Sequence, residues 1–496
     1  MEGSHLMVTA PKKVINGWAM YDWANSVYNL VITTTFFPIY FLKITEEHFG
    51  SANIPFLGRT FVNSSLYDYA LAASYLLIAL LYPILTSIAD TRGYKKNFMR
   101  FFCYLGAAGC SLLFLFDGSN LGWGIIWLML ASMGYNGSLV FYNAYLPEIA
   151  APEDRDRISA KGYAYGYVGS VLLQVIGFLL VLTIKNQFLS LRLNFLLVGL
   201  WWAGFAQFTF AVLPKISQTL VKKSNVFTDG WAEIRKVYGE VKKMAVLKRF
   251  LRGFFFYSMG VQTVMLASTL FGSKMLGLED TKLIVTVVLI QLVAIVGATW
   301  MSRLSARYGN IKVLMGVVLF WIVVCISAYL TAGMAEPLKP YHEKIAALKS
   351  RIGILKIQEA KAPHDTATNN HFDREEGRIQ GELSKWQSEL APQQGPIEYS
   401  FYLLALAVGL VMGGIQSLSR STYAKLMPET KDTASYFSYY DITEKIAIVI
   451  GMFSFGYIEE LTNSMKNSVI FLIVFFAIGL IWLYSALLKQ RQGQAA

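Results

Sequence analysis

The chain has 496 residues, of which 55% are hydrophobic and only 15% are charged, and its mean hydropathy is +0.43. Soluble domains carry about 25% charged residues, so this deficit over such a length indicates a polytopic membrane protein. The net charge of +12 does not indicate nucleic-acid binding, because the basic residues lie in short segments between apolar runs.

The first residues, MEGSHLM, have the character of an expression-tag remnant, which makes Met7 the expected native start. A cleavable signal peptide is not expected, because the first apolar segment is too long and too polar on one face. Cys103, Cys110 and Cys325 all lie in apolar segments and are expected to be buried thiols rather than a disulfide framework.

Apolar runs of the length needed to cross the bilayer core, about 20 residues, occur twelve times in the chain. They cover residues 16–43, 66–89, 98–116, 121–146, 162–184, 191–213, 250–273, 282–304, 311–334, 398–420, 436–459 and 467–488. The predicted fold class is therefore an all-α polytopic membrane protein with 12 transmembrane helices.

Basic residues collect in every second connection between these runs. They are Arg92, Lys95, Lys96, Arg100, Arg155, Arg157, Lys161, Arg303, Arg307, Lys312, Arg420, Lys425, Lys431, Lys489 and Arg491. Since cytoplasmic loops are enriched in Lys and Arg, this asymmetry places both termini in the cytoplasm.

The connections also predict a domain organisation with two bundles of six helices. Its parts are a tag remnant and cytoplasmic N-terminus (1–15), an N-terminal six-helix bundle (16–213), a cytoplasmic linker (214–249), a C-terminal bundle in two parts (250–334 and 398–488), an insert between those parts (335–397) and a cytoplasmic tail (489–496).

The linker 214–249 is strongly basic, and Trp231, Ile234, Tyr238 and Val241 repeat in it at helical spacing. This pattern predicts an amphipathic helix on the inner membrane surface, held by apolar burial and by anionic lipid. A simple tether between the two bundles fits the same pattern.

The insert 335–397 is polar and balanced in charge. Apolar residues alternate three and four apart in two series, Ile345, Leu348, Ile352, Leu355 and Ile379, Leu383, Trp386, Leu390, on either side of KAPHDTATNN. Two such series predict an antiparallel helical hairpin, which we expect on the extracytoplasmic face. Residues 340–392 could bind an extracytoplasmic partner or gate access, and a decoration without a transport role is the simpler interpretation.

Three short motifs recur in the two halves in the same order. Asp90-Thr-Arg-Gly-Tyr-Lys-Lys96 matches Ala306-Arg-Tyr-Gly-Asn-Ile-Lys312, Leu146-Pro-Glu148 matches Met427-Pro-Glu429, and Tyr21-Asp-Trp-Ala-Asn-Ser26 has a weaker echo in Tyr257-Ser-Met-Gly-Val-Gln-Thr263. Repeated bundles of this kind are common in transporters.

These features resemble the major facilitator superfamily. Within it WAMYDWANSVYN, ADTRGYKK, GGIQSLSRSTYAKLMPE and YFSYYDITEKIA resemble the vacuole-effluxer-like family, whose namesakes are yeast vacuolar amino-acid exporters active in autophagy. The resemblance covers nearly the whole chain except 335–397. It implies the major facilitator fold and a bacterial inner-membrane transporter that exports small polar metabolites, amino acids foremost, by proton-coupled alternating access. Members usually carry an Asn-Asp pair where this chain has Ser258-Met259, so a second acidic coupling position is expected to be absent.

Ionisable residues at bilayer depth cost roughly 2.5–3.5 kcal/mol on insertion scales and are therefore candidates for function. Asp22 is the leading candidate, because Asn25 and Asn29 follow it at helical spacing on one face. We expect these three residues to line a substrate or proton pathway. The structural alternative is a carboxylate that reaches the interface or is paired with a fixed cation.

Histidine is not expected to carry protons through the membrane, because all five histidines fall outside the predicted spans. They are His5, His48, His342, His364 and His371. Proton coupling would therefore require carboxylates that titrate.

A second charged cluster consists of Asp441, Glu444 and Lys445 in the eleventh span, with Arg420 at the end of the tenth. The three residues of the eleventh span can meet on one side of a helix, and Arg420 is expected to pair with either acid. The cluster is predicted to be an ion-pair or coupling network, acting either as a static brace or as a moving gate.

By the resemblance, spans one, four, seven and ten line a central cavity. Their further polar residues are Asn136, Tyr142, Asn143, Gln262, Thr263, Gln416 and Ser417. Such neutral hydrogen-bonding groups suit a small zwitterion or polar solute. Tyr163 and Tyr167 of the fifth span could add to the cavity wall, although packing is their simpler role.

A cytoplasmic gate motif is predicted at Asp90, Arg92 and Gly93, with Arg307 and Gly309 in the second copy. A glycine in a tight loop lets two helix ends approach, and Asp90 can cap or pair across the halves in one conformational state only. Since Ala306 replaces the aspartate in the second copy, the gate is expected to be asymmetric.

The chain contains no Gly-Lys-Ser/Thr phosphate loop, so an ATP-driven pump is not expected. We also expect no enzyme activity, no cofactor and no metal site. The expected partners are a small-molecule substrate, membrane lipid and protons. Two other functions fit the sequence, namely a lipid or amphiphile translocase and a non-transporting receptor or assembly platform that uses the outer hairpin.

Overall fold

The computed structural model describes residues 8–214, 226–278, 280–361, 366–462 and 464–495. The predicted tag remnant and the linker residues 215–225 lie outside these ranges, as do His5 and His364. Below, the first half denotes residues 8–214 and the second half denotes the described residues from 245 onward.

The first half is helical except for one β-hairpin. Its elements are α1 (Lys12–Val27), η1 (Tyr28–Phe36), α2 (Phe37–Phe49), β1 (Asn53–Phe56), β2 (Arg59–Val62), α3 (Asn63–Arg92), α4 (Lys95–Leu112), η2 (Leu113–Leu115), α5 (Leu121–Ala144), α6 (Leu146–Ile149), α7 (Arg155–Thr183) and α8 (Gln187–Val212). The π-helix η1 joins α1 to α2, so the first predicted span is one continuous helical rod. The antiparallel β1–β2 hairpin pairs Asn53 with Val62 and was not predicted from the sequence.

The rest of the described chain is entirely helical. Its elements are α9 (Val226–Lys243), α10 (Ala245–Leu270), η3 (Phe271–Met275), α11 (Asp280–Tyr308), α12 (Asn310–Ala335), η4 (Glu336–Leu338), α13 (Lys339–Lys361), α14 (Thr366–Leu426), α15 (Thr433–Thr462) and α16 (Met465–Ala495).

Ten helical segments in the described part of the chain are long and apolar enough to cross a membrane. They confirm the prediction of a polytopic, helical membrane protein. The other two predicted spans correspond to α10 and α15, which are long helices that carry several charged residues. That α10 and α15 cross the membrane remains a prediction.

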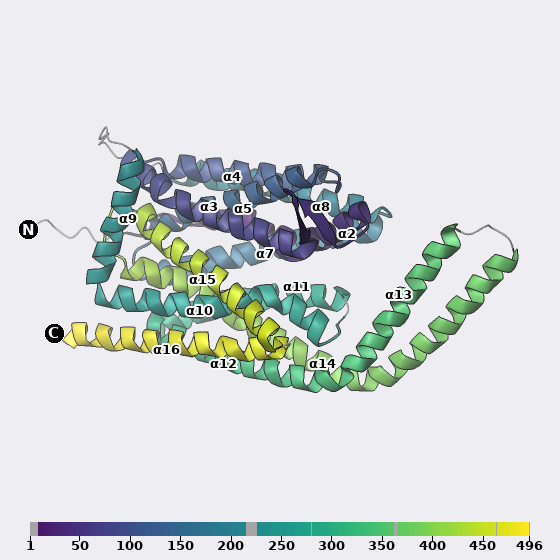
Figure 1. Ribbon diagram of the computed structural model, residues 1–496. Helices are drawn as coiled ribbons and strands as arrows, with labels where there is room; N and C mark the ends of the chain where they lie inside the picture. Colours follow the sequence, from purple (N-terminus) through teal and green to yellow (C-terminus); the bar gives the residue numbers. More distant parts are fainter. Residues whose placement is uncertain (1–7, 215–225, 279, 362–365, 463, 496) are drawn as a thin grey trace, which may run out of the picture.

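The long helices run side by side, with α9 across one end of the bundle (Figure 1). At this end α1 begins and α16 ends, and we call it the terminal end. The arm formed by α13 and the first part of α14 projects from the opposite end, which we call the hairpin end.

Helices of the same half make most of the contacts. In the first half α4 packs on α5 and α8, and α1 packs on α7 and α8; in the second half α11 packs on α14, and α16 packs on α10 and α12. The halves meet where α7 contacts α11 and α14, and where α15 contacts α3 and α5. These four helix pairs form most of the interface between the halves.

Small residues allow the closest approach within the first half. A Cβ atom at Gly134 of α5 would lie 2.2 Å from the backbone nitrogen of Gly106 in α4. The backbones of α4 and α5 can touch here only because both residues lack side chains, as in many membrane helix pairs.

The projecting arm has the seam that the sequence predicts. Leu348, Leu355 and Ile379 form a small buried core, against which Ile352, Leu383 and Trp386 pack. Ile345, the first residue of one apolar series, and Leu390, the last residue of the other, instead pack with the main core at the base of the arm. The antiparallel helical hairpin is therefore present, while its side of the membrane stays a prediction.

The insert does not end at a helix boundary. α14 runs continuously through residue 397, although the sequence suggested a division between the insert and the tenth span there. Pro392 and Pro396 lie inside α14, and proline in a helix interior permits a bend without ending the helix. Figure 1 shows α14 changing direction between the arm and the bundle.

α9 is helical, as predicted, but its apolar stripe does not face lipid alone. Val237 and Val241 are buried, and α9 packs on α3 and α15. Trp231 and Tyr238 are half exposed and remain available for a membrane surface. The interpretation of the whole stripe as a membrane-facing surface was thus wrong for Val241, because the bundle ends provide an apolar partner.

Candidate functional site

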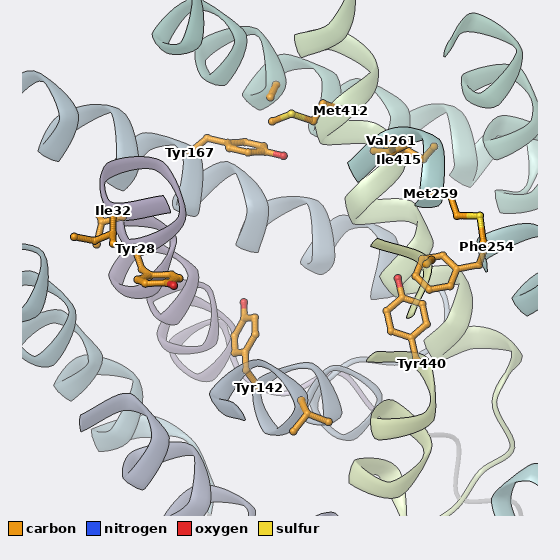
Figure 2. Packing of buried hydrophobic residues seen from close by; sticks show 14 of the residues in the cluster. Tyr28, Ile32, Tyr142, Tyr167, Phe254, Met259, Val261, Met412, Ile415 and Tyr440 are labelled. Carbon is orange, nitrogen blue, oxygen red and sulfur yellow. The ribbon is translucent and has the colours of Figure 1, made fainter. Parts of the chain in front are cut away.

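A cavity of about 550 Å³ lies between the two halves. Its wall consists of Asp22, Ser26, Tyr82, Tyr135, Asn136, Leu139, Asn143, Tyr163, Arg420, Tyr440, Asp441, Glu444 and Lys445. Charged, hydroxyl and amide side chains from both halves converge in this wall, and such convergent polar groups can fix the orientation of a small polar ligand. Figure 2 shows buried residues of this region, with Tyr142 from the first half and Tyr440 and Phe254 from the second.

An ion pair in the cavity wall connects the two halves. Nη1 of Arg420, on α14, lies 3.3 Å from Oδ2 of Asp22, on α1, and both residues are buried. The Tyr142 hydroxyl donates to the same Asp22 oxygen at 2.7 Å. The expectation that Arg420 pairs with Asp441 or Glu444 was wrong, because folding brings α1 closer to the guanidinium than either acid of α15.

Arg420 is bound on every side. Nε donates to the Ser159 hydroxyl at 3.0 Å, Nη2 to the Ser159 carbonyl at 2.9 Å, and Nη1 to Oδ1 of Asn143 at 3.3 Å. The rings of Trp18 and Tyr163 lie 4.9 and 4.3 Å from the guanidinium carbon. Hydrogen bonds, an ion pair and cation–π contacts together satisfy this buried cation.

A glycine makes room for the pair. A Cβ atom at Gly162 of α7 would lie 2.6 Å from Oδ2 of Asp22 and 3.0 Å from Nη2 of Arg420. Any side chain at residue 162 would therefore displace the ion pair.

The polar stripe predicted on α1 differs in the structure. Ser26, four residues after Asp22, lines the cavity with it, whereas Asn25 is fully buried outside the cavity wall. Asn29 is exposed, and its Oδ1 accepts from the Thr33 hydroxyl at 3.0 Å inside η1. The wider turn of the π-helix changes the side-chain direction after Tyr28. The i, i+4 spacing from Asp22 is the sequence signal that could have found Ser26.

Asp441, Glu444 and Lys445 all line the cavity from α15. Glu444 accepts a hydrogen bond from Nε2 of Gln262 at 3.2 Å. The Lys445 ammonium lies 3.6 Å from Oε2 of Glu444 and 5.6 Å from the ring centroid of Tyr75, on α3. Glu444 thus connects α15 to α10 within the second half.

The neutral polar residues divide between the cavity and its surroundings. Asn136 and Asn143 line the cavity. Gln416 accepts from the Tyr167 hydroxyl at 2.8 Å, and the Ser417 carbonyl accepts from the Ser159 hydroxyl at 2.8 Å, so both bridge the halves. Thr263 instead packs next to Gly451 of α15 and lies outside the cavity wall. Tyr82, Tyr135 and Tyr440 were not predicted as cavity residues.

Asp90 joins the halves at the terminal end. Its carboxylate accepts from the backbone N–H groups of Ala434 and Ser435, at 3.2 and 2.8 Å, and from the Ser435 hydroxyl at 2.8 Å. These groups lie in the first turn of α15, so Asp90 caps a helix of the other half and meets its positive dipole end. Lys95 lies 3.0 Å from Asp90 and also binds Glu148.

The glycines of both loop copies adopt positive φ angles, +69° at Gly93 and +87° at Gly309. Glycine tolerates this conformation, and at Gly93 it ends α3 so that α4 can begin two residues later. Arg92 and Arg307 are exposed, and Arg307 lies over the ring of the adjacent Tyr308.

A second contact at the terminal end was missed by the sequence analysis. Asp156 of α7 accepts from the Ser305 hydroxyl, from Nδ2 of Asn310 and from the Lys425 ammonium, each at 2.6 Å. Asp156 lies beside the second loop copy, in which Ala306 stands where the first copy has Asp90. No repeat in the sequence points to Asp156, because this carboxylate comes from the opposite half.

The sequence model of the vacuole effluxer Atg22-like family matches residues 10–345 and 392–496. The chain belongs to this family. Most of the projecting arm, residues 346–391, lies outside the match.

Two relatives, one bacterial and one fungal, are similar to this chain over most of its length. An uncharacterised MFS-type transporter, YxiO, of Bacillus subtilis is 26% identical over 94% of this chain and 93% of its own length. Autophagy-related protein 22-1 of Penicillium rubens is 22% identical over 88% of this chain and 77% of its own length.

Solved structures with the same fold include the human organic anion transporter MFSD10, with a TM-score of 0.64 and 11% identity, covering 95% of this chain and 99% of that one. The proton:xylose symporter XylE of the major facilitator superfamily has a TM-score of 0.62 and 9% identity, covering 95% and 94%. At such identities the likeness shows the fold alone. Family and fold together support a multi-pass membrane protein that acts as a secondary transporter.

Proposed function

We propose that the protein exports small polar metabolites, amino acids foremost, across the bacterial inner membrane by proton-coupled alternating access. Two six-helix bundles, 16–213 and 250–334 with 398–488, would rock about the central cavity, and α10 and α15 would complete the twelve spans. The observation that carries the proposal is the buried Asp22–Arg420 pair, which links the halves at the wall of a cavity of about 550 Å³.

The Asp22–Arg420 pair can couple a proton to the conformational change. Protonation of Asp22 removes the negative charge that faces Arg420, and this weakens an ion pair that exists only while the halves are close at this point. A group whose interaction energy differs between two conformations shifts their populations when it titrates. Asp22 is therefore the proposed proton carrier, and it needs no second acid at Met259.

The contacts between the halves support a state that is closed at the terminal end. Asp90, Asp156 and Arg420 make their hydrogen bonds to the other half at or near the ends of α3, α7 and α14. If the termini are cytoplasmic, as the basic residues indicate, this end faces the cytoplasm. The described conformation would then be the outward-facing one.

Transport can be tested with the purified full chain in liposomes under an imposed pH gradient and with a panel of labelled amino acids. We expect flux of at least one amino acid, driven by the gradient. Asp22→Asn is expected to abolish gradient-driven flux while the protein stays folded by thermal unfolding. Absence of flux for the whole panel would contradict the export proposal, and gradient-driven flux by the variant would exclude Asp22 as carrier.

The projecting arm is proposed to be a decoration that transport does not need. Its own small core and the family match that omits residues 346–391 support this view. Deletion of 346–388 keeps Ile345 and Leu390, which pack on the main core, whereas deletion of 340–392 removes them. Unchanged flux in the shorter deletion is expected, and its loss would make the arm a lid or a partner-binding element instead.

The amphiphile alternative has one observation in its favour. A second cavity, of about 620 Å³, is lined by apolar residues of the second half, among them Phe271, Val324 and Phe401. If liposomes with the protein exchange labelled lipid between leaflets faster than empty liposomes while no amino acid moves, this function replaces the first.

A further inference from the structure

Two charged side chains of α15 face the central cavity without adequate partners. Asp441 is 4% exposed, and its carboxylate makes no hydrogen bond or ion pair with any residue that the structure describes. The nearest carboxylate oxygen to the Lys445 ammonium is the one on Glu444 at 3.6 Å, longer than the 2.7–2.9 Å of a charge-assisted hydrogen bond. Both charges line the cavity wall.

The other charged groups of the cavity are already engaged. Asp22 binds Tyr142 and Arg420, and Glu444 accepts from Gln262. Asp441 is buried without a partner in the described part of the chain, which is unfavourable for a charge, and Lys445 has only the longer ion pair with Glu444. Asp441 and Lys445 are therefore the charged groups of the wall that gain most from a ligand of opposite charge.

The two side chains are four residues apart on α15, and therefore one helical turn apart on the same face. A carboxylate and an ammonium at this spacing present opposite charges side by side to the cavity. An α-amino acid carries the complementary pair, an ammonium and a carboxylate on one carbon.

We propose that Asp441 and Lys445 form a zwitterion-binding site, in which Asp441 binds the ammonium group of an amino acid and Lys445 binds its carboxylate. This assignment rests on the proposed function and names the residues that would hold the two charged groups of its substrate in the same cavity. The side chain of the ligand would extend among Tyr82, Tyr135 and Tyr440, which also line the wall. Aromatic rings favour an aromatic or apolar ligand side chain there.

The test compares three probes that differ only in their charged groups: L-phenylalanine, phenethylamine, which lacks the carboxylate, and 3-phenylpropionate, which lacks the amine. Binding to the purified full chain is measured by calorimetry and thermal shift. If a screen of the twenty amino acids shows stronger stabilisation by another one, that amino acid and its amine and acid analogues replace this set.

We expect opposite losses in the two variants. Asp441→Asn should weaken binding of phenylalanine and phenethylamine about tenfold or more and leave 3-phenylpropionate bound as before. Lys445→Gln should weaken phenylalanine and 3-phenylpropionate and spare phenethylamine. Because Asp441 has no partner to lose, Asp441→Asn should also keep or raise the Tm of the ligand-free protein.

Asp373→Asn, which changes an exposed carboxylate on the projecting arm, is the matched control and should bind all three probes normally. Equal weakening of all probes by each variant, or no weakening by either, would overturn the zwitterion site even if wild-type liposomes transport the amino acid. If the wild type neither binds nor moves any of the twenty amino acids, the proposed function fails as well.

Discussion

Arg420 and Lys445 are the two cationic side chains that line the central cavity, and their surroundings differ. Arg420 has a carboxylate, a hydroxyl, a carbonyl, an amide oxygen and aromatic rings around its guanidinium. Lys445 has one carboxylate oxygen at 3.6 Å and one distant ring. A cation that is fully bound by the protein holds the structure together, whereas one that is poorly bound is available to a ligand.

The largest effect is expected from Arg420→Met, which leaves Asp22 buried beside an apolar side chain. Removal of one partner of a buried ion pair costs about 3–5 kcal/mol, so thermal unfolding in detergent should occur at a much lower temperature. The double variant Arg420→Met/Asp22→Asn should recover part of this loss, since it leaves no buried charge. A double variant as unstable as the single one would show that Arg420 stabilises by packing rather than by charge.

Gly162→Ala should have the next largest effect, because the added methyl group would lie 2.6 Å from Oδ2 of Asp22. Overpacking of this kind costs about 1–3 kcal/mol, and here it also displaces the ion pair, so gradient-driven flux should fall with the Tm. Gly204→Ala in α8 is the matched control, since a Cβ atom there meets nothing within 4 Å. If Gly162→Ala raised the Tm as Gly204→Ala should through its higher helix propensity, the added methyl group would not displace the ion pair and the prediction would be wrong.

Asp90→Asn should shift the conformational equilibrium with a smaller effect on folding. Asp90→Asn removes a negative charge from the N-terminal end of α15, where such a charge contributes about 0.3–1 kcal/mol and up to about 2 kcal/mol when partly buried. Asp90 makes this contact to α15 only when the terminal end is closed. Spin labels across the terminal end should therefore report a larger open population. Arg92→Gln, at an exposed neighbour in the same motif, should leave the distance distribution unchanged; a shift of similar size there would remove the special role of Asp90.

The smallest effect is expected for the exposed pair between Lys236 of α9 and Asp432, at 2.7 Å. Burial lowers the pKa of Lys236, but its hydrogen bonds to Asp432 and Glu233 outweigh this, and the pKa of Lys236 is raised. The stabilisation is therefore present at neutral pH and is lost only as the pH rises through the folded-state value. Lys236→Ala should cost about 0.2–1 kcal/mol, and less at high salt. A loss comparable with that of Arg420→Met would mean that this exposed ion pair stabilises the protein as much as the buried Asp22–Arg420 pair does.

The sequence by itself determined much of the framework. Long apolar runs predicted the helices, alternating apolar residues predicted the arm with Leu348, Leu355 and Ile379 in its core, and glycines in repeated loops predicted two tight turns. Each of these features depends on residues close together in the chain. Helical periodicity also indicated that Asp441 and Lys445 share a face, because both belong to one helix.

Only the tertiary structure decided which faces meet. Arg420 pairs with Asp22, 398 residues away, rather than with the nearer acids of α15. Asp156 of α7 binds Ser305, just before the second loop copy, and Asn310 within it. On α1, the rotation of the helix brought Ser26, instead of Asn25, to the cavity, and the wider turn of η1 changed the direction of Asn29. The physical reason is that a helical pattern fixes the relative directions of side chains on one helix, while the packing of one helix on another sets the partner of each face.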